Sequence, residues 1–335
     1  MTDEKPLLVV APNWLGDAVM ALPAIADLKR HFAGRRLVVA GRASVGGLFT
    51  MVPGVERVVN QEVPAIREAQ PSIAVLLPNS FASAWLVRRA QVPERWGYAT
   101  DMRAHLLTRA VRRRKQPMHQ GEYYQYLVRE LGIATGPLEP TLAIPTDAVE
   151  HARRLLAQHG WDGTTSLIVL APGAAYGKAK QWIPAHVVRL VTDLVQVRRV
   201  TCALVGTRSD AATTHAIRRA APNTCQPRIL DLAGATTLPV LAAVISLAAA
   251  CISNDSGAMH LAAAAGVPVV AIFGSTNEKA TSPLARSGVR TEVLTHSVWC
   301  RPCMLRECPI DHRCMTRIEP SRVLASVDRV AKMNP

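Results

Sequence analysis

The stretch from Cys251 to Gly274 constrains the fold of this 335-residue chain more than any other part of its sequence. It reads as the end of a buried strand, a polar turn, a short helix and a second buried strand. Val267 to Phe273 form the apolar run that a parallel strand requires, and Gly266 suits a helix C-terminus. We expect Asn254 or Asp255 to cap the helix, because a short side-chain oxygen accepts from the unpaired amides of a first helical turn.

This helix predicts a binding site as well as a fold. A helix N-terminus at the C-terminal edge of a parallel sheet is a place where phosphate groups bind. Gly257 would let a ligand approach the backbone closely. The alternative is an ordinary strand–turn–helix connection with a routine cap, and the helix alone does not distinguish the two.

The same alternation of strand, turn and helix recurs on both sides of a linker-like stretch, Gly136 to Pro145. Short apolar runs predict further buried strands at residues 7–11, 37–40, 73–77, 166–171 and 200–206. The chain is 49% hydrophobic, enough to bury the cores of two domains. We therefore predict an α/β protein of two halves that divide near residue 145, with a last helix over residues 319–335.

The formal net charge of +14 predicts an anionic partner, either nucleic acid, an acidic membrane or a phosphorylated substrate. The excess is concentrated in one region, where only Glu94 and Asp101 oppose it. Nucleic acid is disfavoured because the arginines are not interleaved with stacking aromatics, although Trp85, Trp96 and Tyr98 lie nearby. The basic residues of the region are Arg88, Arg89, Arg95, Arg103, Arg109, Arg112, Arg113, Arg114 and Lys115.

The sequence also bears on location. The N-terminal apolar run is interrupted by Asn13 and Asp17, unlike an export signal. The longest apolar run, Leu238 to Ile252, contains Pro239 and is too short to cross a bilayer. We expect a soluble cytoplasmic protein whose contact with a membrane is peripheral.

The candidate residues of the first half follow its strands. Asn13, Gly16 and Asp17 lie after the first strand, where doubly wound folds bind ligands. Only one glycine of a dinucleotide fingerprint is present, which argues against a nicotinamide or flavin cofactor. Asp17 is either a carboxylate that interacts with the helix dipole or a general base. Asn79, Ser80 and Arg95 are expected to face the same ligand.

The second half offers a glycine-bearing loop, Pro172 to Pro184, with Lys178 and Lys180. It lacks the ending of a Walker loop, but backbone amides and an ammonium group can hold a diphosphate. Surface solubility is the alternative role for either lysine. Beyond the next strand, Thr207 to Asp210 form a polar loop that could meet a ribose or a base.

Four cysteines, Cys300, Cys303, Cys308 and Cys314, lie within fifteen positions of one another. A tetrahedral structural zinc site, a redox-labile cluster and free thiols all remain open from this spacing. A cytoplasmic setting disfavours stable disulfides.

Four segments in order resemble the lipopolysaccharide heptosyltransferases of glycosyltransferase family 9: Pro12–Asp17, Leu77–Phe81, Pro172–Trp182 and Asn254–His260. The resemblance runs from residue 11 to about residue 284. It implies a GT-B architecture, an α/β fold of two Rossmann-like domains that face a central cleft. Residues 1–145 would be the acceptor-side domain and residues 146–318 the nucleotide-sugar domain, with the helix of residues 319–335 packing back on the first.

The resemblance also implies chemistry and partners. The donor would be ADP-heptose, and L-glycero-D-manno-heptose would pass with inversion, and without an obligatory metal, to the heptosyl-Kdo2-lipid A inner core at the inner membrane. Asp17 would be the base and Lys180 the diphosphate contact. Asp255 would lie near the donor sugar, and the amides of Ser256, Gly257 and Ala258 would bind phosphate. His260 belongs to the same motif but is equally suited to helix packing, and the role of Asp210 in holding ribose stays open.

Two other functions remain as alternatives. A sugar-nucleotide epimerase can share the GT-B architecture, and it would convert the donor without an acceptor. A non-catalytic polyanion-binding protein would use the basic region alone. The sequence leaves the oligomeric state open.

Overall fold

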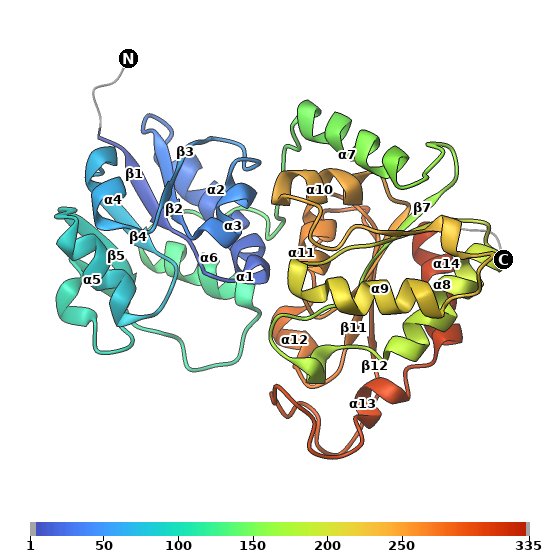
Figure 1. Cartoon of the computed structure of the whole chain (residues 1–335). Coiled ribbons are helices and arrows are strands. Elements are labelled where there is room, and N and C mark those ends of the chain that lie inside the picture. Colours follow the sequence, from blue (N-terminus) through green and yellow to red (C-terminus); the bar gives the residue numbers. More distant parts are fainter. Residues whose placement is uncertain (1–4, 333–335) are drawn as a thin grey trace. The chain divides into compact units, whose positions relative to one another are not determined.

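A computed structural model describes residues 5–332 of the chain. These residues form two compact units that divide between Ala143 and Ile144, beside the predicted boundary (Figure 1). Each unit is an α/β layer structure with one six-stranded sheet in which every neighbouring pair of strands is parallel. The predicted fold class is therefore confirmed.

The sheet of the first unit has the order β3-β2-β1-β4-β5-β6. Alternate strand residues such as Leu8, Val10 and Leu76 pack with α4 and α5 on one face. On the other side, α6 packs against α1 and α2. The elements are β1 (Leu7–Val10), α1 (Leu15–Met20), α2 (Leu22–His31), β2 (Leu37–Gly41), α3 (Ala43–Phe49), β3 (Val55–Asn60), α4 (Val63–Ala69), β4 (Ile73–Leu76), α5 (Phe81–Arg89), β5 (Glu94–Tyr98), η1 (Ala104–Leu106), β6 (Arg109–Val111) and α6 (Gln120–Glu130).

The sheet of the second unit has the order β12-β11-β10-β7-β8-β9, which is the same winding. Its core residues Ile168, Ile252 and Ile272 pack with α8, α9 and α14. The elements are α7 (Thr146–Gln158), β7 (Leu167–Ala171), η2 (Lys178–Lys180), α8 (Pro184–Val197), β8 (Thr201–Leu204), η3 (Arg208–Asp210), α9 (Ala211–Ala220), η4 (Gln226–Arg228), β9 (Ile229–Asp231), α10 (Leu238–Ser246), β10 (Ala250–Asn254), α11 (Gly257–Ala264), β11 (Val269–Phe273), α12 (Glu278–Thr281), β12 (Thr291–Thr295), α13 (Arg313–Thr316) and α14 (Pro320–Ala331).

The last helix, α14, belongs to the second unit. Its apolar stripe of Val323, Val327 and Val330 is buried in the core beside α8, and its packing against the first domain stays a prediction. Arg198, the residue that follows α8, also forms an ion pair with Asp328 of α14, with 2.7 Å between Nη2 and Oδ2. The final three residues of the predicted range 319–335 lie outside the described residues.

The winding places the candidate loops. In each sheet the strand order reverses between two central neighbours, β1 and β4 in the first unit and β7 and β10 in the second. Ligands of doubly wound sheets bind beyond the carboxyl ends of such strands. Within residues 5–332, no helix is both long enough and apolar enough to cross a bilayer.

Candidate functional site

A buried ion pair lies at the reversal point of the second sheet. Lys180 Nζ is 2.6 Å from Asp255 Oδ2, and their side chains are 14% and 5% exposed. The same carboxylate oxygen accepts from Thr276 Oγ1 at 2.6 Å. The Lys180 ammonium also lies 4.8 Å from the centre of the Tyr176 ring. The pair joins the loop after β7 to the end of β10, and the sequence did not single out Thr276 or Tyr176.

Asn254, the last residue of β10, bonds to both ends of the loop of residues 172–182, which we call the lysine loop. Its Oδ1 accepts from Trp182 N at 3.0 Å, and its Nδ2 donates to Pro172 O at 2.6 Å. Both side chains proposed as caps of α11 are thus engaged elsewhere, Asn254 here and Asp255 with Lys180. The capping prediction is wrong, because tertiary partners from residues 172–182 take the oxygens that a cap would use.

The N-terminus of α11 lies next to this ion pair. Ser256 is its N-cap residue, and no side chain bonds to the first-turn amides among the described residues. The Ser256 hydroxyl is 3.0 Å from that of Ser253. The amides of Gly257 and Ala258 therefore begin the helix at the edge where an anion binds. His260 is 3% exposed, which places it inside the packed body of the helix.

Lys178 and the Thr207–Asp210 loop lie on the same edge of this sheet. Lys178 is exposed, unlike Lys180. The Asp210 carboxylate accepts from Thr207 N at 2.8 Å and Thr207 Oγ1 at 2.7 Å, closing a capping box. A side chain at Gly173 would overlap Asp210. Asp210 thus lies against the loop that begins at Pro172. Its carboxylate already stabilises the turn after β8.

In the first unit, Asp17 lies in the first turn of α1, after β1. Its carboxylate accepts from the hydroxyl of Tyr124 on α6. Burial, then the charge of Asp17, raises the pKa of Tyr124 well above its ordinary value. The tyrosine therefore stays a neutral donor that fixes the orientation of the carboxylate. No local pattern in the sequence indicates this contact, because more than a hundred residues separate its partners.

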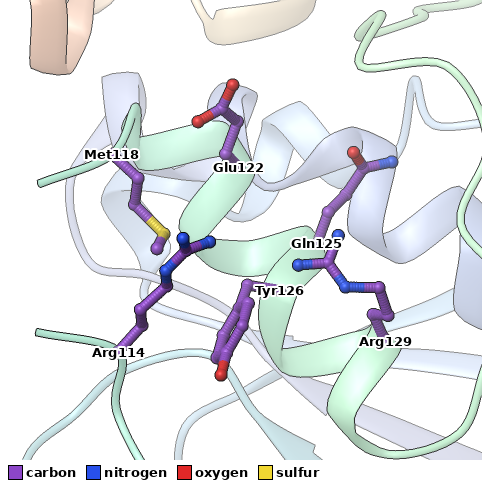
Figure 2. A pocket seen from close by; sticks show the side chains of 6 residues that line it. All are labelled: Arg114, Met118, Glu122, Gln125, Tyr126 and Arg129. Carbon is purple, nitrogen blue, oxygen red and sulfur yellow. The ribbon is translucent and has the colours of Figure 1, made fainter. Parts of the chain in front are cut away.

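Removing the Tyr124 hydroxyl tests whether it positions Asp17. We expect Tyr124→Phe to lower kcat about tenfold, the effect of losing one hydrogen bond to a charged group, with an unchanged KM for the donor. Tyr126→Phe is the control, since that ring lies at the outer side of α6 (Figure 2). Steady-state kinetics of both variants measure the difference. Equal kcat values in the two variants would show that the contact is only structural.

A hollow of about 390 Å³ opens at the reversal point of the first sheet. Asn13 and Ser80, two of the expected acceptor-side residues, both line it, and their role stays a prediction. Asn79 lies beside it, and its Oδ1 accepts from the Tyr123 hydroxyl at 3.1 Å. The lining residues are Asn13, Gly41, Arg42, Ala43, Asn60, Gln61, Glu62, Pro78, Ser80, Ala82, Ser83 and Leu86. Gly16 lies within α1, one residue before Asp17.

Arg95 does not belong to this hollow. It is the second residue of β5, near the opposite edge of the sheet, and its guanidinium donates to the carbonyls of Val92, Pro93 and Leu106 at 2.7 Å. The missed arginine is Arg103, which is fully buried and donates to Pro78 O at 2.5 Å and Ser83 Oγ at 2.8 Å. These bonds hold the loop that bears Asn79 and Ser80. Burial lowers the pKa of Arg103 to about 10.

The predicted basic region divides accordingly. Arg95 and Arg103 serve the fold, and Arg109 stacks on Trp96 at 4.5 Å and donates to Leu131 O. The other six residues of the region are exposed: Arg88, Arg89, Arg112, Arg113, Arg114 and Lys115. Arg114 also lines a hollow of about 250 Å³ beside α6, in which Tyr126 lies between Arg114 and Arg129 (Figure 2).

The four clustered cysteines are unbridged. Cys314 is buried, and burial together with the neighbouring thiols raises its pKa to about 11. Across residues 5–332, no three or more histidine, cysteine or acidic side chains are arranged to hold a metal ion. The zinc interpretation of the cysteine spacing therefore stays a prediction.

Comparison with known proteins identifies the family. The profile described as glycosyltransferase family 9 (heptosyltransferase) matches residues 63–313. Lipooligosaccharide heptosyltransferase 2 of Haemophilus influenzae is 27% identical, over 83% of this chain and 86% of its own. Lipopolysaccharide heptosyltransferase 2 of Salmonella typhimurium is 28% identical, over 86% and 88%.

A solved structure matches as well. The ADP-heptose lipopolysaccharide heptosyltransferase II of Escherichia coli superposes with a TM-score of 0.83 at 25% identity, covering 98% of each chain. That match supports the GT-B architecture that the sequence implied. Because the family profile spans most of its length, this chain belongs to glycosyltransferase family 9, the heptosyltransferases.

Proposed function

We propose that this glycosyltransferase moves L-glycero-D-manno-heptose from ADP-heptose to the heptosyl-Kdo2-lipid A inner core of lipopolysaccharide. The observation that carries the proposal is the Lys180–Asp255 pair beside the start of α11, at the reversal point of a doubly wound sheet. The relatives named above, heptosyltransferases 2 of lipopolysaccharide or lipooligosaccharide, support this choice of donor and acceptor.

The donor side supplies charge neutralisation. As the bond from the sugar to the diphosphate breaks, negative charge accumulates on the leaving ADP. The Lys180 ammonium and the amides of Ser256, Gly257 and Ala258 are the groups that would meet it. Groups that bind this developing charge more strongly than the ground state lower the barrier. Asp255 holds the lysine in place and lies near the sugar, and Asp210 and Thr207 are proposed to face the nucleoside.

The acceptor side supplies the base. Asp17 would take the proton of the attacking hydroxyl, and attack from the face opposite to the departing ADP inverts the anomeric carbon. The hydrogen bond from Tyr124 would hold the Asp17 carboxylate in position for this proton transfer. Asn13, Asn79 and Ser80 border the hollow in which we place the acceptor sugars.

A lipid-linked acceptor requires contact with a membrane, and α5 has the surface for it. Phe81 and Trp85 stack at 6.3 Å between ring centroids and are 39% and 48% exposed. Arg88 and Arg89 follow one turn later on the same helix. Exposed aromatics beside basic residues suit an anionic lipid surface. The same helix lines the hollow through Ser83 and Leu86, so we propose peripheral binding to the cytoplasmic face of the inner membrane.

Vesicle binding tests this surface. We expect the double variant Phe81→Ser/Trp85→Ser to bind vesicles containing phosphatidylglycerol about tenfold more weakly, because both rings leave the interface. Arg88→Gln should weaken binding about fivefold, roughly 1 kcal/mol for one basic residue. Val197→Ser, at an exposed apolar position of the second unit, is the control. Equal sedimentation of all variants with the vesicles would contradict membrane binding through α5.

A transfer assay tests the proposed function itself. The purified chain is incubated with ADP-heptose and truncated lipopolysaccharide acceptors, and ADP release and acceptor mass are followed. We expect one heptose to be added to an acceptor that already carries heptosyl-Kdo2. Conversion of the sugar nucleotide with no acceptor present would instead indicate an epimerase. Binding of polyanions without affinity for the sugar nucleotide would indicate a non-catalytic role.

A further inference from the structure

The cysteine-bearing segment, residues 298–312 between β12 and α13, contacts the loop that carries Lys180. Arg306 O accepts from Ala179 N at 2.9 Å, and Met304 O accepts from the Tyr176 hydroxyl at 2.8 Å. The His312 ring nitrogen Nε2 lies 3.0 Å from Ala179 O. Two of these bonds join the segment to the short turn Lys178–Lys180, and the third joins it to Tyr176 just before that turn.

The fit between the two segments is close. Gly177 immediately precedes that turn, and a Cβ added to it would overlap the carbonyl oxygen of Arg306 and lie 2.9 Å from the Arg306 Cβ. Its φ of +155° also leaves little freedom for a side chain. Arg306 and Lys180 both lie over the Tyr176 ring, at 5.3 and 4.8 Å. The lysine loop is therefore in direct backbone contact with the cysteine-bearing segment.

The same segment holds the loop after β11, which carries Thr276. Met304 N donates to Ser275 O at 2.9 Å. The Arg301 guanidinium donates to Gly274 O at 2.7 Å and to Thr276 O at 3.2 Å, and it pairs with Glu278 at 2.6 Å. The Arg301 side chain is only 10% exposed, so these bonds are shielded from water.

One residue from each of the two loops bonds to the same carboxylate. Lys180 from the first loop and Thr276 from the second meet at Asp255 Oδ2, each at 2.6 Å. In addition to this shared contact, residues 298–312 bond to both the lysine loop and the loop after β11. Three of the four clustered cysteines, Cys300, Cys303 and Cys308, are part of this segment, and its contacts with both loops are made by hydrogen bonds.

We propose that residues 298–312 form a brace that sets the position of Lys180 and Thr276 on Asp255, with Arg301 as its main positioning residue. The inference rests on the proposed function, because Lys180 is there assigned to the donor diphosphate. The brace acts on donor binding, since its described bonds go to the two loops that meet at Asp255. It also gives the cysteine-bearing segment a role that its spacing alone did not reveal.

The test uses the full-length chain and ADP as the probe, measured by calorimetry, with KM values for both substrates. We expect Arg301→Gln and Gly177→Ala each to raise the dissociation constant of ADP and the KM for ADP-heptose by about tenfold to a hundredfold. The KM for the acceptor should stay unchanged. Arg301→Lys, which keeps one charged donor, should fall between Arg301→Gln and the unsubstituted chain.

Two further variants distinguish a specific loss of donor binding from a loss of folded structure. Tyr176→Phe removes only the hydroxyl bond to Met304 O and keeps the ring over Lys180, so the fold should be intact while the KM for ADP-heptose rises a few-fold. Arg313→Gln breaks an exposed ion pair with Asp311 on the outer side of the same region, and it should bind ADP normally.

The outcomes separate the two proposals. If the unsubstituted chain binds ADP and the Arg301, Gly177 and Tyr176 variants bind it equally well, the brace is overturned while the proposed function stands. A rise in the KM for the acceptor equal to that for the donor would likewise overturn it, as a general loss of structure. If the unsubstituted chain does not bind ADP, the proposed function fails, and the brace fails with it.

Discussion

Asp17→Asn should lower kcat by two to four orders of magnitude, the usual contribution of a general base, while the dissociation constant of ADP stays unchanged. The amide has the size of the carboxylate and still accepts from the Tyr124 hydroxyl, so the local structure should be retained. Stopped-assay kinetics and calorimetry with ADP measure the two quantities. Near-normal turnover would remove Asp17 from the mechanism.

A matched control separates catalysis from helix stabilisation. Asp147 also lies in the first turn of its helix, α7, and is exposed. If Asp17 acted only on the helix dipole, both Asp→Asn variants would lose less than about 1 kcal/mol of stability and keep full activity. We expect only Asp147→Asn to behave in this way.

Lys180→Gln should damage both activity and stability. Loss of the ammonium removes the main counter-charge of the diphosphate, so we expect kcat to fall about a hundredfold or more and the KM for ADP-heptose to rise at least tenfold. The buried Asp255 carboxylate then lacks its cation, which should cost roughly 3 kcal/mol of the free energy of unfolding. Kinetics and urea denaturation measure the two effects.

A double variant distinguishes the two roles of the lysine. Lys180→Gln/Asp255→Asn removes both charges and should regain most of the stability, because no unpaired carboxylate is left, but it should not regain transfer. Lys178→Gln is the control, since that lysine is exposed two residues away, and its effect should be much smaller. Recovery of transfer in the double variant would show that Lys180 serves only to neutralise Asp255.

The alternation of apolar runs predicted the two doubly wound sheets, because buried parallel strands require such runs in any context. The resemblance of the four segments also singled out Lys180, Asp255 and Asp17, which lie in the segments that follow β7, β10 and β1. It assigned the wrong local role to Asn254 and Asp255, since a turn beside a helix looks the same whether its oxygens cap the helix or bind a distant loop.

The residues that the sequence missed act through partners far away in the chain. Thr276 lies 21 residues from Asp255, and Arg103 lies 25 residues from the carbonyl of Pro78. No local pattern marks such pairs. Arg95 illustrates the opposite error, because a charge count cannot tell an arginine that binds backbone carbonyls from one that faces an anion.

The shared winding of the two sheets has a consequence for how such enzymes diversify. Each half has its own reversal point of strand order and its own loops at the carboxyl ends of its strands. Exchange of the first half between two relatives would then alter which alcohol is glycosylated and leave the choice of activated sugar intact. New glycan structures can arise in this way by recombination, without reinvention of the chemistry.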